Sequence, residues 1–113
     1  MILPSKELLS EVLGKEIEIR GFKDEFIPSN FEYIEDFCNV KVINIYELAH
    51  LCKEWAFSEK YFIVSGFILF GQNISIVSFD LKGEIHRCKD DSEFEAVVQA
   101  CEWVLKEKQC GEK

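Results

Sequence analysis

The chain has 113 residues, of which 48% are hydrophobic and ten are phenylalanine, so its length and composition exclude a disordered protein and suit one compact domain. The net charge of −8 argues against a nucleic-acid-binding protein and against a protein that binds anionic membranes, because both need clustered lysine and arginine. An acidic surface is consistent with solubility or with attraction to a basic partner.

Two features indicate the compartment. Residues 1–14 lack the basic stretch and apolar core of a signal peptide, and the longest apolar run, YFIVSGFILFG, is far shorter than a spanning helix. Five cysteines, an odd number without CxxC spacing, favour buried reduced thiols over a disulfide framework. We therefore expect a cytoplasmic protein.

The first part of the chain predicts one helix followed by strands. Residues 4–15 form a short helix, which Ser5 can cap and Gly14 can end. Alternation of apolar and charged residues predicts a strand at 16–22, and two further strands are expected at 31–37 and 40–43. The turn residues between 23 and 30 predict a loop.

The clearest predicted helix spans residues 44–59. Asn44 is a good N-cap, and Glu47 can reach back to it. One apolar face of this helix is expected to pack in the hydrophobic core. A second stripe, at spacings of four, three and four, consists of Tyr46, His50, Lys53 and Phe57. A helix with two such faces is normally covered on more than one side, so we expect this stripe to be covered.

The second half of the chain predicts a three-stranded meander and a last helix. Residues 61–70 are apolar on both faces and predict a central strand, and strands follow at 74–81 and 84–88. Ser92 and Glu95 form a capping box for the last helix. The expected fold class is α+β: residues 1–113 form a single domain, a two-layer sandwich of mostly antiparallel sheet with about three helices on one face.

Trp103 is out of phase with the other large apolar residues of the last helix. Phe94, Val97, Val98, Cys101 and Leu105 form the stripe expected to face the sheet. Trp103 follows Phe94 by nine residues, about 900° of rotation, so we expect it on the opposite side, beside Ala96, Ala100 and Glu107. Three interpretations remain open: this strip packs against the middle helix, it binds a partner or a second copy, or Trp103 is exposed without a role.

No motif predicts catalysis, a metal or a cofactor. Two H-x-C pairs occur, His50 with Cys52 and His86 with Cys88, but helical residues two apart diverge, and two ligands do not make a zinc site. The glycines do not match a phosphate-binding loop. The acidic run DDSEFE is explained by helix-cap electrostatics. We therefore expect a non-enzymatic protein.

Two helical segments carry a resemblance to known proteins. The runs CKEWA at 52–56 and ACEW at 100–103 resemble the signature helices of a group of short proteins encoded by bacteriophages, prophages and integrated elements. The opening PSKELLSEVLGKEI is similar to the start of the longer members. This chain departs from that group at Leu51, where lysine is usual, and at Phe94, where proline often begins the helix. The resemblance implies a phage or prophage setting but no activity.

Three functional hypotheses follow. The first is a phage-type accessory protein that binds a protein partner, or a second copy, through the Ala96/Ala100/Trp103 strip or the Tyr46/His50/Lys53/Phe57 stripe. The second is an acidic anti-defence inhibitor, such as an anti-CRISPR protein, that imitates nucleic acid. It requires a continuous row among Glu32, Glu35, Asp36, Asp90, Asp91, Glu93 and Glu95. The third is an enzyme that uses Cys88 or His86 in a pocket.

Overall fold

A computed structural model describes residues 3–23, 29–68, 72–79, 83–90 and 92–111. Within them the chain forms three helices and six strands. In chain order these are α1 (Lys6–Leu13), β1 (Ile17–Phe22), β2 (Asn30–Glu35), β3 (Asn39–Asn44), α2 (Ile45–Ser58), β4 (Tyr61–Ile68), β5 (Gln72–Phe79), β6 (Glu84–Asp90) and α3 (Glu93–Gly111).

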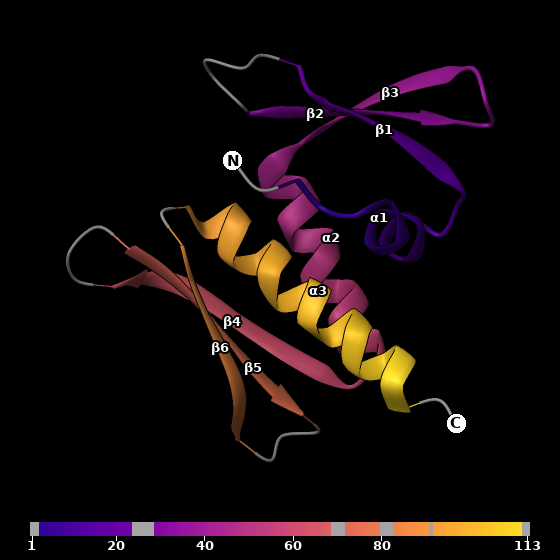
Figure 1. The fold of residues 1–113 in the computed structure, drawn as a ribbon. Coiled ribbons are helices and arrows are strands. Elements are labelled where there is room, and N and C mark those ends of the chain that lie inside the picture. The colour runs from indigo at the N-terminus through magenta and orange to yellow at the C-terminus, as the bar shows by residue number, and fades with distance from the viewer. Residues whose placement is uncertain (1–2, 24–28, 69–71, 80–82, 91, 112–113) are drawn as a thin grey trace.

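The six strands form two separate antiparallel sheets, with orders β1-β2-β3 and β4-β5-β6. Figure 1 shows the helices lying between the first sheet, at the top, and the second, at the bottom. The α+β class, the three helices, the antiparallel pairing and the meander are confirmed. The sequence did not predict that the strands would divide into two sheets with the helices between them.

The helical layer holds the two sheets together. α3 contacts all three strands of the second sheet and also packs on α2. In the first sheet, α1 contacts β1 and α2 contacts β3. The backbone N–H and Oγ of Ser5 both donate to Glu102 Oε1, at 3.1 and 2.7 Å, and so join the start of α1 to α3. Lys108 Nζ donates to Glu59 Oε1 at 3.0 Å and to Glu11 Oε1 at 3.5 Å, close to the ends of all three helices.

The helix boundaries follow from local capping chemistry. Ser5 Oγ accepts from the Leu8 N–H at 3.1 Å, and Gly14 ends α1 with a φ of 70°. Asn44 Oδ1 accepts from the Tyr46 N–H at 2.9 Å, and Ser92 Oγ accepts from the Glu95 N–H at 3.1 Å. The predicted starts of the three helices are therefore confirmed.

The prediction that residues 61–70 form a central strand is wrong. β4 lies at an edge of the second sheet, and β5 lies at its centre. Ile63 faces the helices and is buried, whereas Phe62 and Val64 lie on the other face and are exposed. Apolar residues on both faces therefore do not imply strands on both sides here.

The predicted loop at 23–30 falls largely outside the described residues, and Asn30 begins β2.

Ala100 is fully buried on α3, so we predict that Ala100→Leu is destabilising. The added side chain has no space in a close-packed layer, and such overpacking lowers the free energy of unfolding by about 1–3 kcal/mol. Urea denaturation followed by circular dichroism measures the change. Lys106→Leu, on an exposed position of the same helix, is the control. Equal stability of the two variants would contradict the burial of this face.

Candidate functional site

The second stripe of α2 is the most exposed apolar helix face in the described part of the chain. Tyr46 is 70% exposed and Phe57 is 66% exposed, although both lie on an ordered helix with a buried opposite face. His50 is exposed, and Lys53 is half-buried between them. No described segment covers Tyr46 or Phe57, so the expectation that this stripe is covered is not met within the molecule.

A groove runs between this stripe and β4. The cavity measures about 320 Å³, and its walls are His50, Lys53, Glu54 and Phe57 from α2 and Phe62 and Ile63 from β4. The rings of Phe57 and Phe62 meet edge to face, with their centroids 6.3 Å apart. This contact joins the exposed helix stripe to the outer face of β4. The result is one apolar surface built from two elements, which we call the α2/β4 groove.

The charges around the α2/β4 groove are paired. His50 Nε2 lies 2.6 Å from Glu54 Oε1, one turn further along α2, and Lys53 Nζ lies 4.0 Å from Glu93 Oε1 at the start of α3. The His50–Glu54 pair is largely solvent-exposed and the Lys53–Glu93 pair is partly exposed, so each contributes little to stability. The apolar part of the groove wall comes from Phe57, Phe62 and Ile63.

The predicted orientation of Trp103 is wrong. Its indole stacks on the imidazole of His86 in β6, with centroids 4.5 Å apart and planes 5° apart, and meets Tyr61 of β4 edge-on at 6.3 Å. Trp103 therefore faces the second sheet. Ala96 and Ala100 of the same strip are fully buried, and small residues here let α3 approach the strands closely. This strip is internal packing and offers no free docking surface.

The stripe opposite Trp103 packs on the other side of α3. Phe94 meets Phe22 of β1 at 6.1 Å, and Cys101 Sγ donates to the Cys52 carbonyl of α2 at 3.4 Å. The two stripes are half a turn apart, as the sequence predicts, but the Phe94 stripe meets β1 and α2, while Trp103 meets the second sheet. A helix between two layers buries both faces, so the phase alone does not tell which face meets strands.

Glu107, the last member of the predicted strip, lies at the rim of a second hollow. This hollow, of about 340 Å³, lies where the end of α2 meets the start of β4, and its lining also includes Tyr61, Phe79 and Lys108. Burial, followed by the charges of Glu107 and Glu59, raises the pKa of Tyr61 above its usual value. The phenol of Tyr61 therefore stays neutral at physiological pH.

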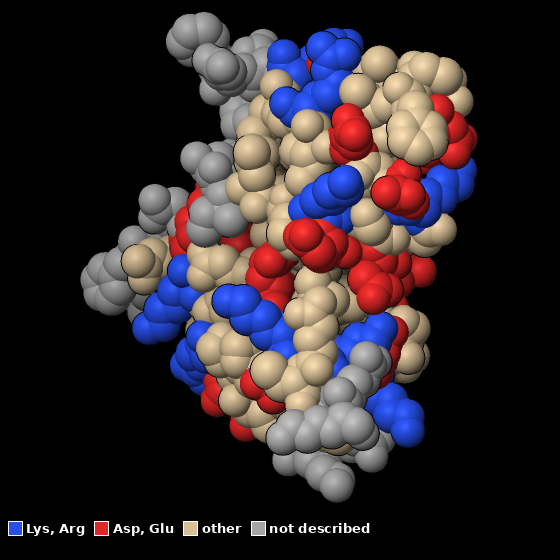
Figure 2. Space-filling model, turned by 45° about the vertical axis from the view of Figure 1, so that its right-hand side comes forward, with Lys and Arg blue, Asp and Glu red and all other residues tan. Residues whose placement is uncertain are grey.

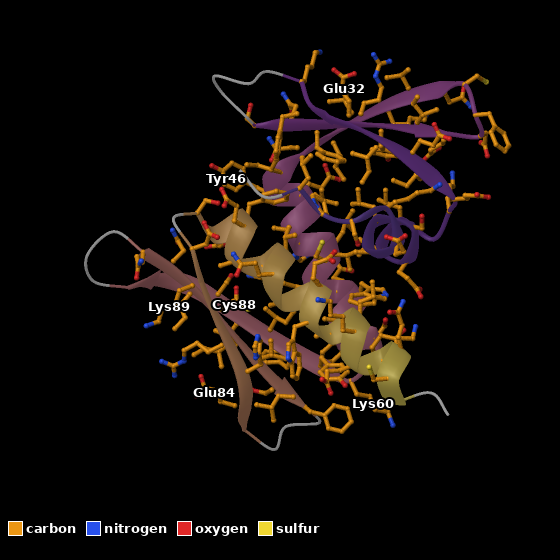
Figure 3. The ribbon with its side chains drawn as sticks, viewed as in Figure 1. Glu32, Tyr46, Lys60, Glu84, Cys88 and Lys89 are labelled. Atoms are coloured by element: carbon orange, nitrogen blue, oxygen red, sulfur yellow. The ribbon has the colours of Figure 1, made fainter. Side chains whose placement is uncertain are left out.

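The cysteines of both H-x-C pairs are buried. His50 is exposed while Cys52 is fully buried on the opposite side of α2, so the two side chains diverge. Cys88 is buried on β6 (Figure 3), and burial raises the pKa of its thiol. The neighbouring Cys52 side chain, and then burial, raise the pKa of Cys101 well above its usual value. Among the described residues, no cluster of three or more His, Cys, Asp or Glu could hold a metal ion.

The acidic residues proposed for nucleic-acid mimicry do not share one face. Glu32 lies on the outer side of the first sheet (Figure 3), where its carboxylate is 3.9 Å from Arg20 Nε. Glu35, on the same strand, is buried on the inner side and binds Lys15 Nζ at 3.3 Å. Asp91 lies outside the described residues. On the face in Figure 2, lysine and arginine side chains are interspersed among the carboxylates.

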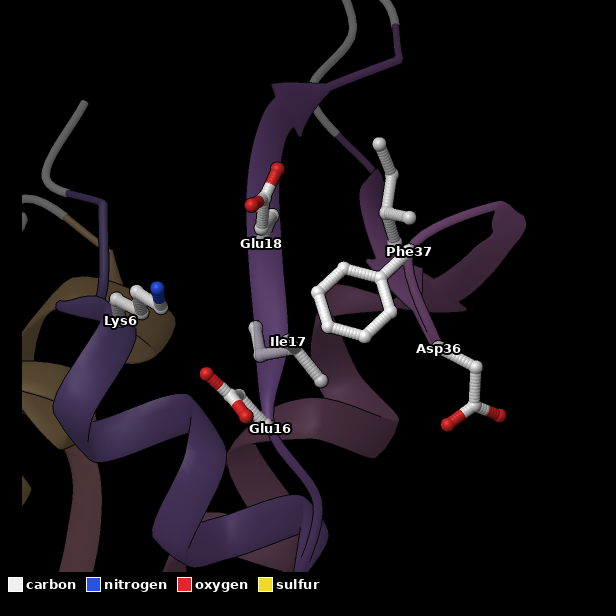
Figure 4. A pocket seen from close by; sticks show the side chains of 7 residues that line it. Lys6, Glu16, Ile17, Glu18, Asp36 and Phe37 are labelled. Carbon is white, nitrogen blue, oxygen red and sulfur yellow. The ribbon is translucent and has the colours of Figure 1, made fainter.

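A third hollow lies beside an unusual turn. It measures about 100 Å³, and Figure 4 shows Phe37 and Asp36 at one side and Lys6 at the other. Asp36 and Phe37 both have positive φ, at 51° and 69°, and the Phe37 ring is 90% exposed at the tip of the β2–β3 hairpin. A bulky residue rarely adopts this conformation. No sequence signal marks this turn, because the pattern predicts Phe37 as the last residue of a strand.

In comparisons with protein-family models, with curated proteins and with solved structures, no match to this chain was found. The resemblance to phage-encoded proteins therefore stays a prediction. None of the described helices combines the length and the apolar character that crossing a membrane requires.

The burial of three of the five cysteines predicts two classes of thiol. Cys38 and Cys110 are exposed and should react at once with an aromatic disulfide reagent in the native protein. Cys52, Cys88 and Cys101 are buried and should react only after unfolding in guanidinium. Absorbance of the released thiolate counts both classes. A third fast thiol in the native protein would contradict the thiol environment described above.

Trp103→Ala should act on stability, because the ring stacks on His86 inside the fold. Loss of a partly buried tryptophan lowers the free energy of unfolding by about 2–4 kcal/mol, somewhat less than for a fully buried one. Tyr46→Ala, an exposed aromatic on α2, should change it by no more than about 0.5 kcal/mol. Thermal and urea unfolding of both variants give the comparison, and similar values would be inconsistent with the two placements.

Proposed function

We propose that this protein is a non-enzymatic binding module whose contact surface is the α2/β4 groove together with Tyr46. The observation that carries the proposal is the exposure of Tyr46 and Phe57 on a helix whose other face is fully packed. Exposed aromatic side chains contribute little to the stability of the free protein, while tyrosine and other aromatics are enriched among residues that anchor interfaces.

A phage or prophage setting for this module rests on the resemblance of the runs at 52–56 and 100–103 and of the opening PSKELLSEVLGKEI. The resemblance supports a binding role, because small proteins of such origin commonly act by binding a larger protein. A protein partner and a second copy both fit the exposed stripe. A cytoplasmic location remains part of the proposal.

The net charge of −8 favours a partner with a basic surface around its contact. Nucleic-acid mimicry is not adopted as a second candidate, because Glu32 and Glu35 lie on opposite sides of the first sheet and each has a cationic neighbour. The charge therefore acts through long-range attraction in this proposal and not through an imitation of phosphates.

Phe57→Ala and Tyr46→Ala should each weaken partner binding by at least about tenfold, the usual size of an aromatic hot spot. Immobilised wild-type protein and variants are incubated with bacterial lysate, and the retained proteins are quantified by mass spectrometry. Support requires a protein that wild type retains and both variants lose.

Phe37→Ala is the matched control, because Phe37 is an exposed aromatic far from α2 on the β2–β3 turn. It should retain the same proteins as wild type. Equal retention by all four proteins would reject the α2/β4 groove as the contact. Light scattering of the wild type and of Phe57→Ala distinguishes a second copy from a different partner.

A further inference from the structure

β4 has a free edge that is unlike the other edges of the two sheets. Its residues Tyr61–Ile68 include no charged residue and no proline, and they pair with β5 in an unbroken register. Their other edge has no strand neighbour, and in the described part of the chain no backbone hydrogen bond reaches it from another segment. β4 therefore presents a row of unpaired backbone donors and acceptors.

The other edge strands carry features that oppose pairing. β1 has a bulge near Gly21 and the charged residues Glu18 and Arg20. β6 has a register shift against β5 and four charged residues, and β3 has Lys41. Natural proteins protect edges with charges and bulges, because an open apolar edge pairs with other chains. An unprotected edge eight residues long is expected where pairing is used.

The free edge of β4 also belongs to the α2/β4 groove. Phe62 and Ile63 of β4 form one wall, and Phe57, Lys53 and His50 of α2 form the other. An edge strand beside a helix gives an incoming chain two kinds of contact. The backbone of β4 supplies hydrogen bonds, and the aromatic rings supply contacts to alternate side chains.

We propose that the α2/β4 groove binds an extended peptide segment of a partner protein, which adds to the second sheet as a strand beside β4. This inference rests on the proposed function and deepens it by naming the class of ligand. The segment has apolar side chains at alternate positions, which project to the outer face of the sheet and contact Phe57, Phe62 and Val64. Its flanks are basic, because the protein carries a net charge of −8.

Two other occupants fit less well. A helix laid on the α2 stripe would contact Tyr46 and Phe57 but would leave the backbone groups of β4 unpaired. In a second copy that paired through its own β4, α2 of that copy would also lie next to the new strand pair. In addition, two molecules that each carry a charge of −8 repel each other.

The test uses a displayed library of random peptides of about twelve residues, long enough for a typical strand. Peptides selected on the wild-type protein should have apolar residues at every second position. Backbone N-methylation of alternate residues should weaken binding by about tenfold, and methylation of the intervening residues should have little effect, because only one set of N–H groups faces β4. Fluorescence anisotropy measures both.

Val64→Lys is the protein variant, because a lysine on an edge strand opposes pairing. Val64 is 51% exposed, so the fold should tolerate the change, and peptide affinity should fall by about tenfold. Val40→Lys, at a 49% exposed site on the edge strand β3, is the matched control and should bind as wild type does. Circular dichroism verifies that both variants are folded.

Several results would overturn strand addition. Peptides with apolar residues at helical spacing that lose affinity with Phe57→Ala, but tolerate Val64→Lys and N-methylation, reject it and leave the proposed function intact. The same holds if no peptide is selected while a lysate protein is still lost with Phe57→Ala. A dimer abolished by Val64→Lys identifies a second copy instead. Binding that is insensitive to both Phe57→Ala and Val64→Lys rejects both proposals.

Discussion

The burial of α3 on two opposite faces is the constraint on which the rest of the structure depends. On one side Trp103 stacks on His86 and Ala100 is closed off from solvent. On the other side Phe94 meets Phe22, and Cys101 donates to the Cys52 carbonyl. This double burial joins the second sheet, which α3 covers, to α1 and α2, which contact the first sheet. α3 spreads over all three strands of the second sheet, and α2 packs against that sheet at β4.

That position of α2 explains the candidate binding surface. With its core face packed on α3 and the first sheet, the helix has no further layer to cover its second stripe, and Tyr46 and Phe57 remain in solvent. The same geometry leaves β4 as an edge and brings Phe62 against Phe57. The exposed stripe, the groove and the open edge are therefore three consequences of one arrangement. Removing any of them would require a further element beside α2.

The core contains buried polar groups that lower its stability. Ser65 and Ser75 lie opposite each other in the register of β4 and β5. Their hydroxyls and Trp55 Nε1 are buried and have no hydrogen-bond partner among the described residues. Each such unsatisfied group typically lowers the free energy of unfolding by about 1–3 kcal/mol. Small side chains at these two positions lie on the face of the sheet that α3 covers, where Ala96 and Ala100 are also small. Small side chains on both the helix and the sheet therefore allow the two to approach closely.

The sequence by itself determined the helix starts, the strands, the antiparallel meander and the α+β class, because caps and periodicity are local properties that Ser5, Asn44 and Ser92 carry in their own side chains. It also determined the phase of Trp103 and the four residues of the exposed α2 stripe. Only the tertiary structure decided which layer each face meets. Apolar periodicity records that a face is buried, not by what, so Trp103 was placed on the wrong side and β4 at the centre of a sheet. The α2/β4 groove was equally out of reach, since Phe57 and Phe62 come together only when helix and edge strand are packed.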